Sequence, residues 1–533
     1  MKLTLCTTAL TALTVTTSMA LVTPAATAAP PESALARYYD QRLAWRSCVF
    51  GPDDEGGKYL EKAGARCANV TVPLDYADPG GRTIKVAISR IKATDTRHRV
   101  GPMLLNYGGP GDPTLYLPPV IRDAMKGVAA RYDLIGMDPR FVGRSTGMDC
   151  EWPVSTYVLS AGLGRASFER QVGLHKRLAD ACRDTHGDVL PHVSTRNAAR
   201  DMDVIRGSLG APKLSYLGYS YGTYLGTVYT QMFPGRYDRM VLDSALDPAR
   251  YQPQLMRGAE PENERALADW ATWAAKRHGK YQLGRTRAQV LATIDRVVAK
   301  SARGLTLGTA PDTYRIDDTH VPLLLLSGNA DDTDAGRKDL ADTVSVLARA
   351  AMGKPTRLTE SLTATLRVAL TGAESAYGST QTAILCGDVA APRDPEHYWR
   401  DIERSRAAHP VFGPLANNIN PCAFWDRPRE QPTQVSDDAR ALIVAATGDP
   451  RTPYPVQGKR RPTAAASRHP AAHRQGRQPA RALRRVRQRL RGRQGQRLSG
   501  HGKAPGQERD LRCPVALRGS AGFEGRSGHI TAM

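Results

Sequence analysis

A serine between two glycines is the residue of this sequence best placed to do chemistry. The segment Leu214–Gly222 is a short apolar run that ends in the pattern Gly-Tyr-Ser-Tyr-Gly around Ser220. This pattern is typical of a nucleophile elbow, a sharp strand-to-helix turn that presents a serine hydroxyl above a sheet. Gly218 and Gly222 leave space where a Cβ would crowd the turn. Residues 223–233 have the length of a helix, which the following Pro-Gly pair ends.

An attacking serine needs hydrogen-bond donors for the oxyanion it creates, and a glycine-rich loop upstream can supply them. The segment Asn106–Gly111 reads Asn-Tyr-Gly-Gly-Pro-Gly and follows a short apolar run. We expect the backbone N–H groups of Gly109 and Tyr221 to form the oxyanion hole. A plain turn at the end of a strand is equally rich in glycine and proline. The position of the loop before the elbow favours the oxyanion hole.

Two aspartates compete for the role of the catalytic acid. Asp449 and Asp243 each follow a short apolar run, and both come after Ser220 in the chain. The order serine, acid, histidine is compatible with either. We expect Asp449 to be the acid, because it precedes the place where a last strand and a histidine should come. Asp243 and Asp247 are expected to cap or brace loops.

The sequence supplies no clear general base. His175, His186 and His192 precede the serine and are expected at the surface. Four further histidines lie in a C-terminal segment of unusual composition: His469, His473, His501 and His529. Without a base the serine hydroxyl stays neutral, and acyl transfer falls by several orders of magnitude. The triad of the chain as written is therefore incomplete, which would leave it inactive.

The positive charge is concentrated in that C-terminal segment. The chain has a net charge of +22, but residues 458–533 hold 19 of its 74 Lys and Arg and only three of its 52 acidic residues. The remaining body is close to balanced, so the charge does not indicate nucleic-acid binding. The segment has neither helical nor strand periodicity. One interpretation is a disordered basic arm that binds acidic polymers.

A slip of the reading frame is the interpretation that we favour. A one-base shift near Val456–Gly458 would turn the arginine codons into Ala, Asp, Gly or Val. The shifted reading allows a helix end and a strand over residues 462–475, and a closing helix further on. It also allows a histidine at codon 480, which is 31 positions after Asp449, and a stop at codon 515. The basic tail would then be an error.

Residues 1–29 have the pattern of a secretory signal, with Lys2, an apolar stretch and a small-residue cleavage site at 26–28. The alternative is a membrane anchor, which the break at Pro24 disfavours.

Outside this signal and the tail the chain has six cysteines, an even set that suits disulfides in a secreted protein: Cys48, Cys67, Cys150, Cys182, Cys386 and Cys422. Their pairing is not fixed by the sequence.

Apolar runs that alternate with helical stretches predict an α/β fold, a mostly parallel sheet with helices on both faces. One such helix is expected over residues 195–209, with Thr195 or Asn197 as its N-cap. The spacing of cysteines and histidines indicates no metal site, and no cofactor is expected. The expected division is a signal at 1–29, a core at 40–248 and 381–457, a helical cap at 249–380 and the tail at 458–533.

Taken together, these motifs resemble the secreted actinobacterial tripeptidyl aminopeptidases, which are proline-iminopeptidase-like α/β-hydrolases. The matching pieces run in family order from about residue 40 to 456: Ala44–Cys48, Cys67–Pro79, Asn106–Gly111, Asp138–Ser145, Gly218–Gly222 and Gly448–Tyr454. The resemblance implies an α/β-hydrolase fold with Ser220 as nucleophile, Asp449 as acid and an inserted helical cap. It also implies release of short peptides, such as tripeptides, from free N-termini.

An aminopeptidase needs carboxylates for the ammonium group of its substrate. Glu260, Glu262 and Glu264 in the expected cap are candidates, and a solvated helix face is the alternative. Peptides are therefore the expected partners, with no nucleic acid and no membrane after removal of the signal. An esterase with the same machinery is the nearest rival, because a fold does not fix a substrate. The sequence leaves the oligomeric state open.

Overall fold

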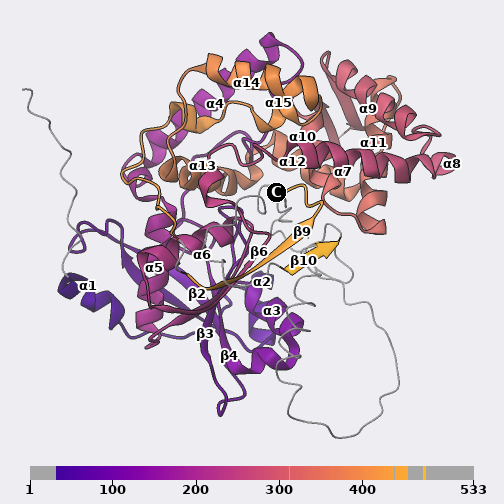
Figure 1. Cartoon of the computed structure of the whole chain (residues 1–533). Coiled ribbons are helices and arrows are strands. Elements are labelled where there is room, and N and C mark those ends of the chain that lie inside the picture. The colour runs from indigo at the N-terminus through magenta and orange to yellow at the C-terminus, as the bar shows by residue number, and fades with distance from the viewer. Residues whose placement is uncertain (1–31, 311, 437–438, 454–471, 476–533) are drawn as a thin grey trace, which may run out of the picture.

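Three segments without a single exposed residue form the centre of the molecule. The strands β3 (Gly101–Asn106), β4 (Tyr132–Met137) and β5 (Leu214–Tyr219) are buried along their whole length. Burial on both faces is typical of a parallel sheet covered by helices on its two sides. The computed structural model describes residues 32–310, 312–436, 439–453 and 472–475 (Figure 1).

Within these residues, eight strands form one sheet in the order β1-β2-β4-β3-β5-β6-β9-β10. β2 runs antiparallel to both of its neighbours, and every other pair is parallel. The expected α/β class with a mostly parallel sheet is confirmed. The remaining strands are β1 (Arg66–Pro73), β2 (Thr83–Ile91), β6 (Tyr237–Asp243), β9 (Ala441–Thr447) and β10 (Ala472–Gln475).

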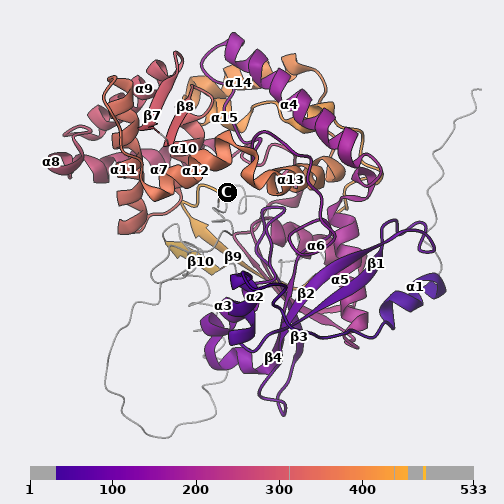
Figure 2. The same cartoon turned by 180° about the vertical axis from the view of Figure 1, so that it is seen from behind.

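Helices cover both faces of this sheet. One face carries α5 (Thr195–Ser208) and α6 (Tyr221–Met232), with α1 (Glu32–Tyr39) packed against α5. The other carries α3 (Leu117–Met125), and α2 (Glu55–Lys62) lies on the same side (Figure 2). The expected N-cap of α5 is wrong by one residue. Ser194 is the cap, because its extended backbone lets its hydroxyl accept the N–H of Asn197.

A layer of helices lies over the carboxyl ends of the strands (Figure 1). Most of it is inserted between β6 and β9, and it also contains the small β7–β8 hairpin (Leu305–Thr309 and Asp312–Ile316). α4 (Arg165–His186), which precedes the elbow, joins this layer. The inserted helices are α7 (Glu260–Ala275), α8 (His278–Tyr281), α9 (Arg287–Ser301), α10 (Val321–Asn329), α11 (Asp334–Ala351), α12 (Glu360–Leu370), α13 (Ser375–Asp388), α14 (Pro395–Ala408) and α15 (Gly413–Ala416).

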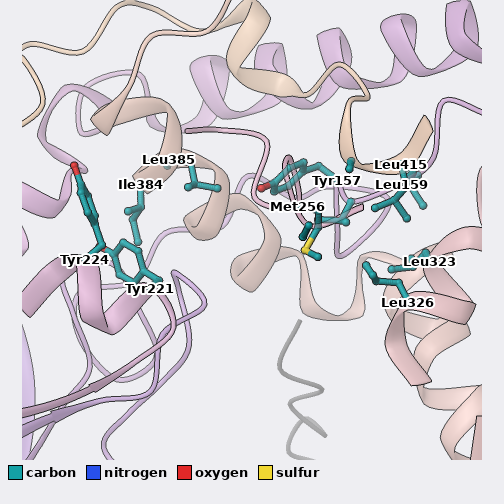
Figure 3. Close-up of a cluster of buried hydrophobic side chains, with 14 of the residues drawn as sticks. Tyr157, Leu159, Tyr221, Tyr224, Met256, Leu323, Leu326, Ile384, Leu385 and Leu415 are labelled. Carbon is teal, nitrogen blue, oxygen red and sulfur yellow. The ribbon is translucent and has the colours of Figure 1, made fainter. Parts of the chain in front are cut away.

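The inserted layer is longer than the sequence suggested. The expected cap boundary at residue 380 falls inside α13, and helices continue to α15 before β9 begins. The apolar contact between layer and core explains why the boundary is hidden. Side chains of α6 and α13 meet there, with Tyr221 and Tyr224 facing Ile384 and Leu385 (Figure 3). Because core and layer share one hydrophobic cluster, the amino-acid composition does not change at the boundary between them.

The structure also differs from the expectation at the end of the sheet. Residues 472–475 were expected to be part of a disordered tail, but they form β10 beside β9. Pairing at a sheet edge uses backbone N–H and C=O groups, so it does not need an apolar side-chain pattern. The expected signal at 1–29 and the rest of 458–533 lie outside the described residues.

Three disulfides join the six cysteines in sequential pairs: Cys48–Cys67, Cys150–Cys182 and Cys386–Cys422. The expected disulfide bonding is confirmed, and the fold decides the pairing that the sequence left open. In the ranges that the structure describes, no helix is both long enough and apolar enough to cross a membrane.

A buried ion pair ties the core together. Arg140 and Asp201 are at most 1% exposed and form two hydrogen bonds of 2.7 Å. The guanidinium also donates to the carbonyls of Leu74 and His192, and Tyr76 donates to the same carboxylate. The pair thus connects β1, the loop after β4 and α5.

Replacing Arg140 with alanine should cost about 3–5 kcal/mol of unfolding free energy, because Asp201 would stay buried without its counter-ion. Urea unfolding followed by circular dichroism measures this loss. Arg82→Ala, which breaks the exposed pair with Asp188, is the control and should change the free energy by less than about 1 kcal/mol. Equal losses in the two variants would contradict this interpretation.

Candidate active site

Ser220 lies in a sharp turn between β5 and α6. Its backbone has φ 50° and ψ −122°, a conformation that costs a non-glycine residue free energy. The two glycines of the motif are required for space. A Cβ at Gly218 would lie 2.5 Å from the carbonyl oxygen of Gly222, and a Cβ at Gly222 would lie 2.8 Å from the carbonyl oxygen of Asn106. The geometry is that of the expected nucleophile elbow.

Hydrogen bonds on both sides hold the elbow. The N–H of Ser220 donates to the carbonyl of Asp243 at the end of β6 (3.1 Å). The carbonyl of Ser220 accepts from the N–H of Thr223 (2.9 Å) and from its hydroxyl (2.6 Å). The same hydroxyl oxygen accepts from the N–H of Leu246 (3.0 Å). The end of β6 therefore braces the turn, and Asp247 caps the short helix that follows by accepting from Ala249.

The glycine loop after β3 packs directly against the elbow. A Cβ at Gly108 would lie 3.1 Å from the Cβ of Ser220 and 3.2 Å from the N of Tyr221. Gly109 follows with φ 96°. Tyr221 is the first residue of α6, so its N–H has no acceptor within the helix. The glycine loop thus lies against the elbow through Gly108, and the oxyanion-hole role of Gly109 and Tyr221 stays a prediction.

A buried carboxylate fixes the chain just beyond this loop. Asp138 is fully buried after β4, and its Oδ1 accepts from the N–H groups of Thr114 (2.7 Å) and Leu115 (2.9 Å). Its Oδ2 accepts from the N–H of Arg144 (2.9 Å). Burial raises the pKa of Asp138, and these donors offset part of that rise. Asp138 therefore positions the loop rather than taking part in the chemistry.

Asp449 lies in the loop that follows β9, at the same edge of the sheet as Ser220. Its Oδ1 accepts from the N–H groups of Arg451 (2.8 Å) and Thr452 (3.2 Å), and its Oδ2 accepts from the hydroxyl of Thr452 (3.0 Å). A carboxylate has about four acceptor positions, so these bonds leave room for one more donor. Burial raises the pKa of Asp449, and the three hydrogen bonds work against this rise.

The Asp449 loop is also attached to the helical layer. The side chain of Asn263 on α7 donates to the carbonyl of Pro450 (2.7 Å), and Arg451 donates to the carbonyl of Leu326 on α10. Arg451 is half-buried, and burial of its guanidinium lowers the pKa of this group to about 10. These contacts connect the helical layer to the loop that carries the expected catalytic acid.

The three glutamates of α7 already have partners in this structure. Glu260 accepts from the side chain of Asn417 (2.8 Å), and Glu264 accepts from the N–H groups of Val411 and Phe412 (3.0 Å each). Glu262 pairs with Arg265 one turn later. These contacts connect α7 to its neighbours in the helical layer.

Asp112 was not among the expected site residues, although it follows directly on the glycine loop. Its side chain is 2% exposed, and its Oδ1 has no hydrogen-bond partner. Burial raises the pKa of its carboxyl to about 7. An acidic residue right after a glycine-rich loop was the only signal for it in the sequence.

One histidine before the serine lies elsewhere than the sequence predicts. His175 was expected at the surface, but it is fully buried in α4. Its Nδ1 is 2.8 Å from the carbonyl of Gln171 and its Nε2 is 3.1 Å from that of Tyr157, and burial lowers its pKa to about 4. Of the later histidines, His473 belongs to β10, and His469, His501 and His529 lie outside the described residues. In the described ranges no group of three His, Cys, Asp or Glu could hold a metal ion.

A strained serine, two backbone donors beside it and a mostly parallel sheet define a serine hydrolase with the α/β-hydrolase fold. A family model for the alpha/beta hydrolase fold matches residues 101–334, and one for TAP-like proteins matches residues 409–480.

Curated relatives agree with this class. The tripeptidyl aminopeptidase of Streptomyces lividans is 34% identical over 411 residues, 73% of each chain. Serine protease Hip1 of Mycobacterium tuberculosis is 30% identical over 425 residues, 73% of this chain and 77% of the relative. Carboxylesterase B of the same species is 31% identical over 445 residues, 77% and 79% of the two chains. The chain belongs to the tripeptidyl aminopeptidase family of α/β hydrolases.

Gly222→Ala should slow the reaction of Ser220 with a fluorophosphonate by at least about 100-fold and cost about 2 kcal/mol of stability, because the new methyl group would overlap Asn106. Labelling rates and thermal unfolding measure both effects. Gly127→Ala is the control, since a Cβ there meets nothing within 4 Å. A Gly222→Ala variant that labels at the normal rate would contradict the crowding argument.

Proposed function

We propose that this protein is a secreted serine aminopeptidase that releases short peptides, such as tripeptides, from free N-termini. The observation that supports this most strongly is the contact between the glycine loop and the Ser220 elbow. This contact supports the proposal, because acyl transfer needs a nucleophile with backbone N–H donors close to it. The three disulfides and the pattern of residues 1–29 support secretion.

In the proposed reaction the Oγ of Ser220 attacks the carbonyl carbon of the third peptide bond of the substrate. The N–H groups of Gly109 and Tyr221 stabilise the oxyanion of the tetrahedral intermediate. The peptide nitrogen then leaves with a proton, and the released chain is shortened by three residues. Water attacks the acyl-enzyme on Ser220, which frees the tripeptide and restores the serine hydroxyl.

Asp449 is the proposed acid, and the general base is proposed to come from the segment that follows β10. β10 runs parallel to β9, so its carboxyl end lies at the same edge of the sheet as Asp449. A histidine delivered from this edge would donate its Nδ1–H to the acceptor position of Asp449 that remains open. Residues 476–533 lie outside the described residues, so the identity of the base is part of the proposal.

An esterase remains the second candidate, because the relative named carboxylesterase B is about as similar as the named peptidases. Both reactions would pass through an acyl-enzyme on Ser220. Peptide cleavage is the harder of the two, because an amine is a poorer leaving group than an alcohol. Polyanion binding by residues 458–533 rests on the sequence, because only residues 472–475 of this segment are among the described residues.

Ser220→Ala should abolish both fluorophosphonate labelling and release of tripeptides from an unblocked octapeptide, while Asp449→Asn should lower kcat about 10⁴-fold. Labelling on a gel and mass spectrometry of the products measure these effects. Asp243→Asn is the matched control and should keep most of the activity if Asp449 is the acid. Turnover of a simple ester with no peptide release would favour the esterase instead.

Sequencing the gene across codons 449–513 tests the origin of the base. We expect a one-base insertion or deletion near codons 456–458, which would place a histidine at codon 480 and remove the arginine-rich tail. A clean reading of the present frame would contradict the slip. The basic tail would then be real, and the triad of this chain would stay incomplete.

A further inference from the structure

Asp112 is a buried group beside the site that the proposed reaction does not use. The oxyanion loop and the N-terminal half of α13 surround it: a Cβ at Gly109 would lie 3.4 Å from its Cγ, and Gln381 donates to the carbonyl of Pro110 (3.2 Å). Tyr377 belongs to the same surroundings, since its hydroxyl accepts from the side chain of Gln381 (3.0 Å), and burial and then the Asp112 carboxylate raise the pKa of this hydroxyl.

The other buried carboxylates around the site differ from Asp112 in their hydrogen bonds. Asp138 and Asp449 each accept at least three, from backbone N–H groups and a hydroxyl. The Oδ1 of Asp112 accepts none, and no ion pair of this side chain occurs among the described residues. A buried carboxyl without a partner costs folding free energy, so its place beside the oxyanion loop needs a reason.

The distance from the nucleophile suggests that reason. A Cβ built on Gly108 would lie 3.1 Å from the Cβ of Ser220. A Cβ built on Gly109 would lie 3.4 Å from the Cγ of Asp112. Because neighbouring Cα atoms lie 3.8 Å apart, the carboxyl is within about 13 Å of the serine Cβ. An extended chain of three residues spans about 10 Å. A hydrogen bond between ammonium and carboxylate adds about 3 Å, so the carboxyl is within reach of the N-terminus of a tripeptide whose carbonyl is bound at Ser220.

We propose that the carboxylate of Asp112 binds the α-ammonium group of the peptide substrate. The proposal rests on the aminopeptidase function proposed above and names the group that selects a free N-terminus. Pairing with an ammonium supplies the missing donor and compensates the buried negative charge. A substrate with an acetylated N-terminus brings no positive charge and leaves Asp112 unpaired.

The glutamates of α7 are the competing site for the ammonium group. Their hydrogen bonds hold the helical layer together: Glu264 accepts two backbone N–H groups before α15, and Glu260 accepts from Asn417. Binding an ammonium there would compete with these contacts. Asp112 has no such contact to lose, which is why the structure favours it.

The test measures peptide binding without turnover. In a Ser220→Ala background, titration calorimetry at pH 7.5 compares tetra-alanine with N-acetyl-tetra-alanine. We expect the unblocked peptide to bind at least about 10-fold more tightly, and Asp112→Asn to remove this preference by weakening only the unblocked peptide. Glu260→Gln and Glu264→Gln, made in the same background, should keep the preference.

Asparagine has almost the shape of aspartate, so the Asp112→Asn chain should fold, and its melting temperature is measured alongside. Asp112→Ser is the second neutral variant and should behave in the same way. A preference that survives both changes, or that disappears in Glu260→Gln or Glu264→Gln instead, would overturn the proposal. Binding that never distinguishes the two peptides would overturn it as well. Labelling of Ser220 in the unmodified chain tests the hydrolase function separately.

Discussion

The structure depends on one constraint, the crowding of the backbone around Ser220. The serine has a positive φ, and the chain before and after it comes so close that a Cβ at Gly218 or Gly222 would overlap a carbonyl oxygen. The glycine loop after β3 approaches the same turn from the other side. Strain of this kind persists only where the surroundings fix it, and here β6 supplies the hydrogen bond that does so. The turn that carries Ser220 and the glycine loop beside it are therefore held in place by the fold itself.

Buried carboxylates organise the structure around this turn. Asp138 holds the chain beyond the oxyanion loop, Asp201 pairs with Arg140 in the core, and Asp388 of α13 connects the helical layer to the elbow helix. Asp388 accepts the N–H of Thr195 (2.6 Å), whose hydroxyl lies 2.6 Å from that of Tyr221, and burial raises the pKa of Asp388 to about 7. Each of these groups is satisfied by fixed donors. Asp112 is the exception, and this contrast is what gives it a proposed role in binding.

Much of the site follows from the sequence because its motifs are local. The elbow needs two glycines at fixed spacing from a serine, and the loop after β3 needs glycines, so both turns are predictable, while the roles of Ser220, Gly109 and Tyr221 stay predictions. Asp449 is predictable only as a strand-end acid, and its role stays a prediction. The buried position of His175 and the N-cap Ser194 were missed, since burial and backbone conformation depend on the neighbours that the fold supplies.

The sequence by itself determined the alternation of buried strands and helices, the nucleophile motif, the even set of cysteines and the family resemblance. These features are carried by residue types at short spacing, and short-range geometry makes them readable. Only the tertiary structure decided the pairing of the cysteines, the extent of the helical layer, the place of β10 beside β9 and the isolation of Asp112. Each of these depends on contacts between segments far apart in the chain, and no local pattern records which distant groups will meet.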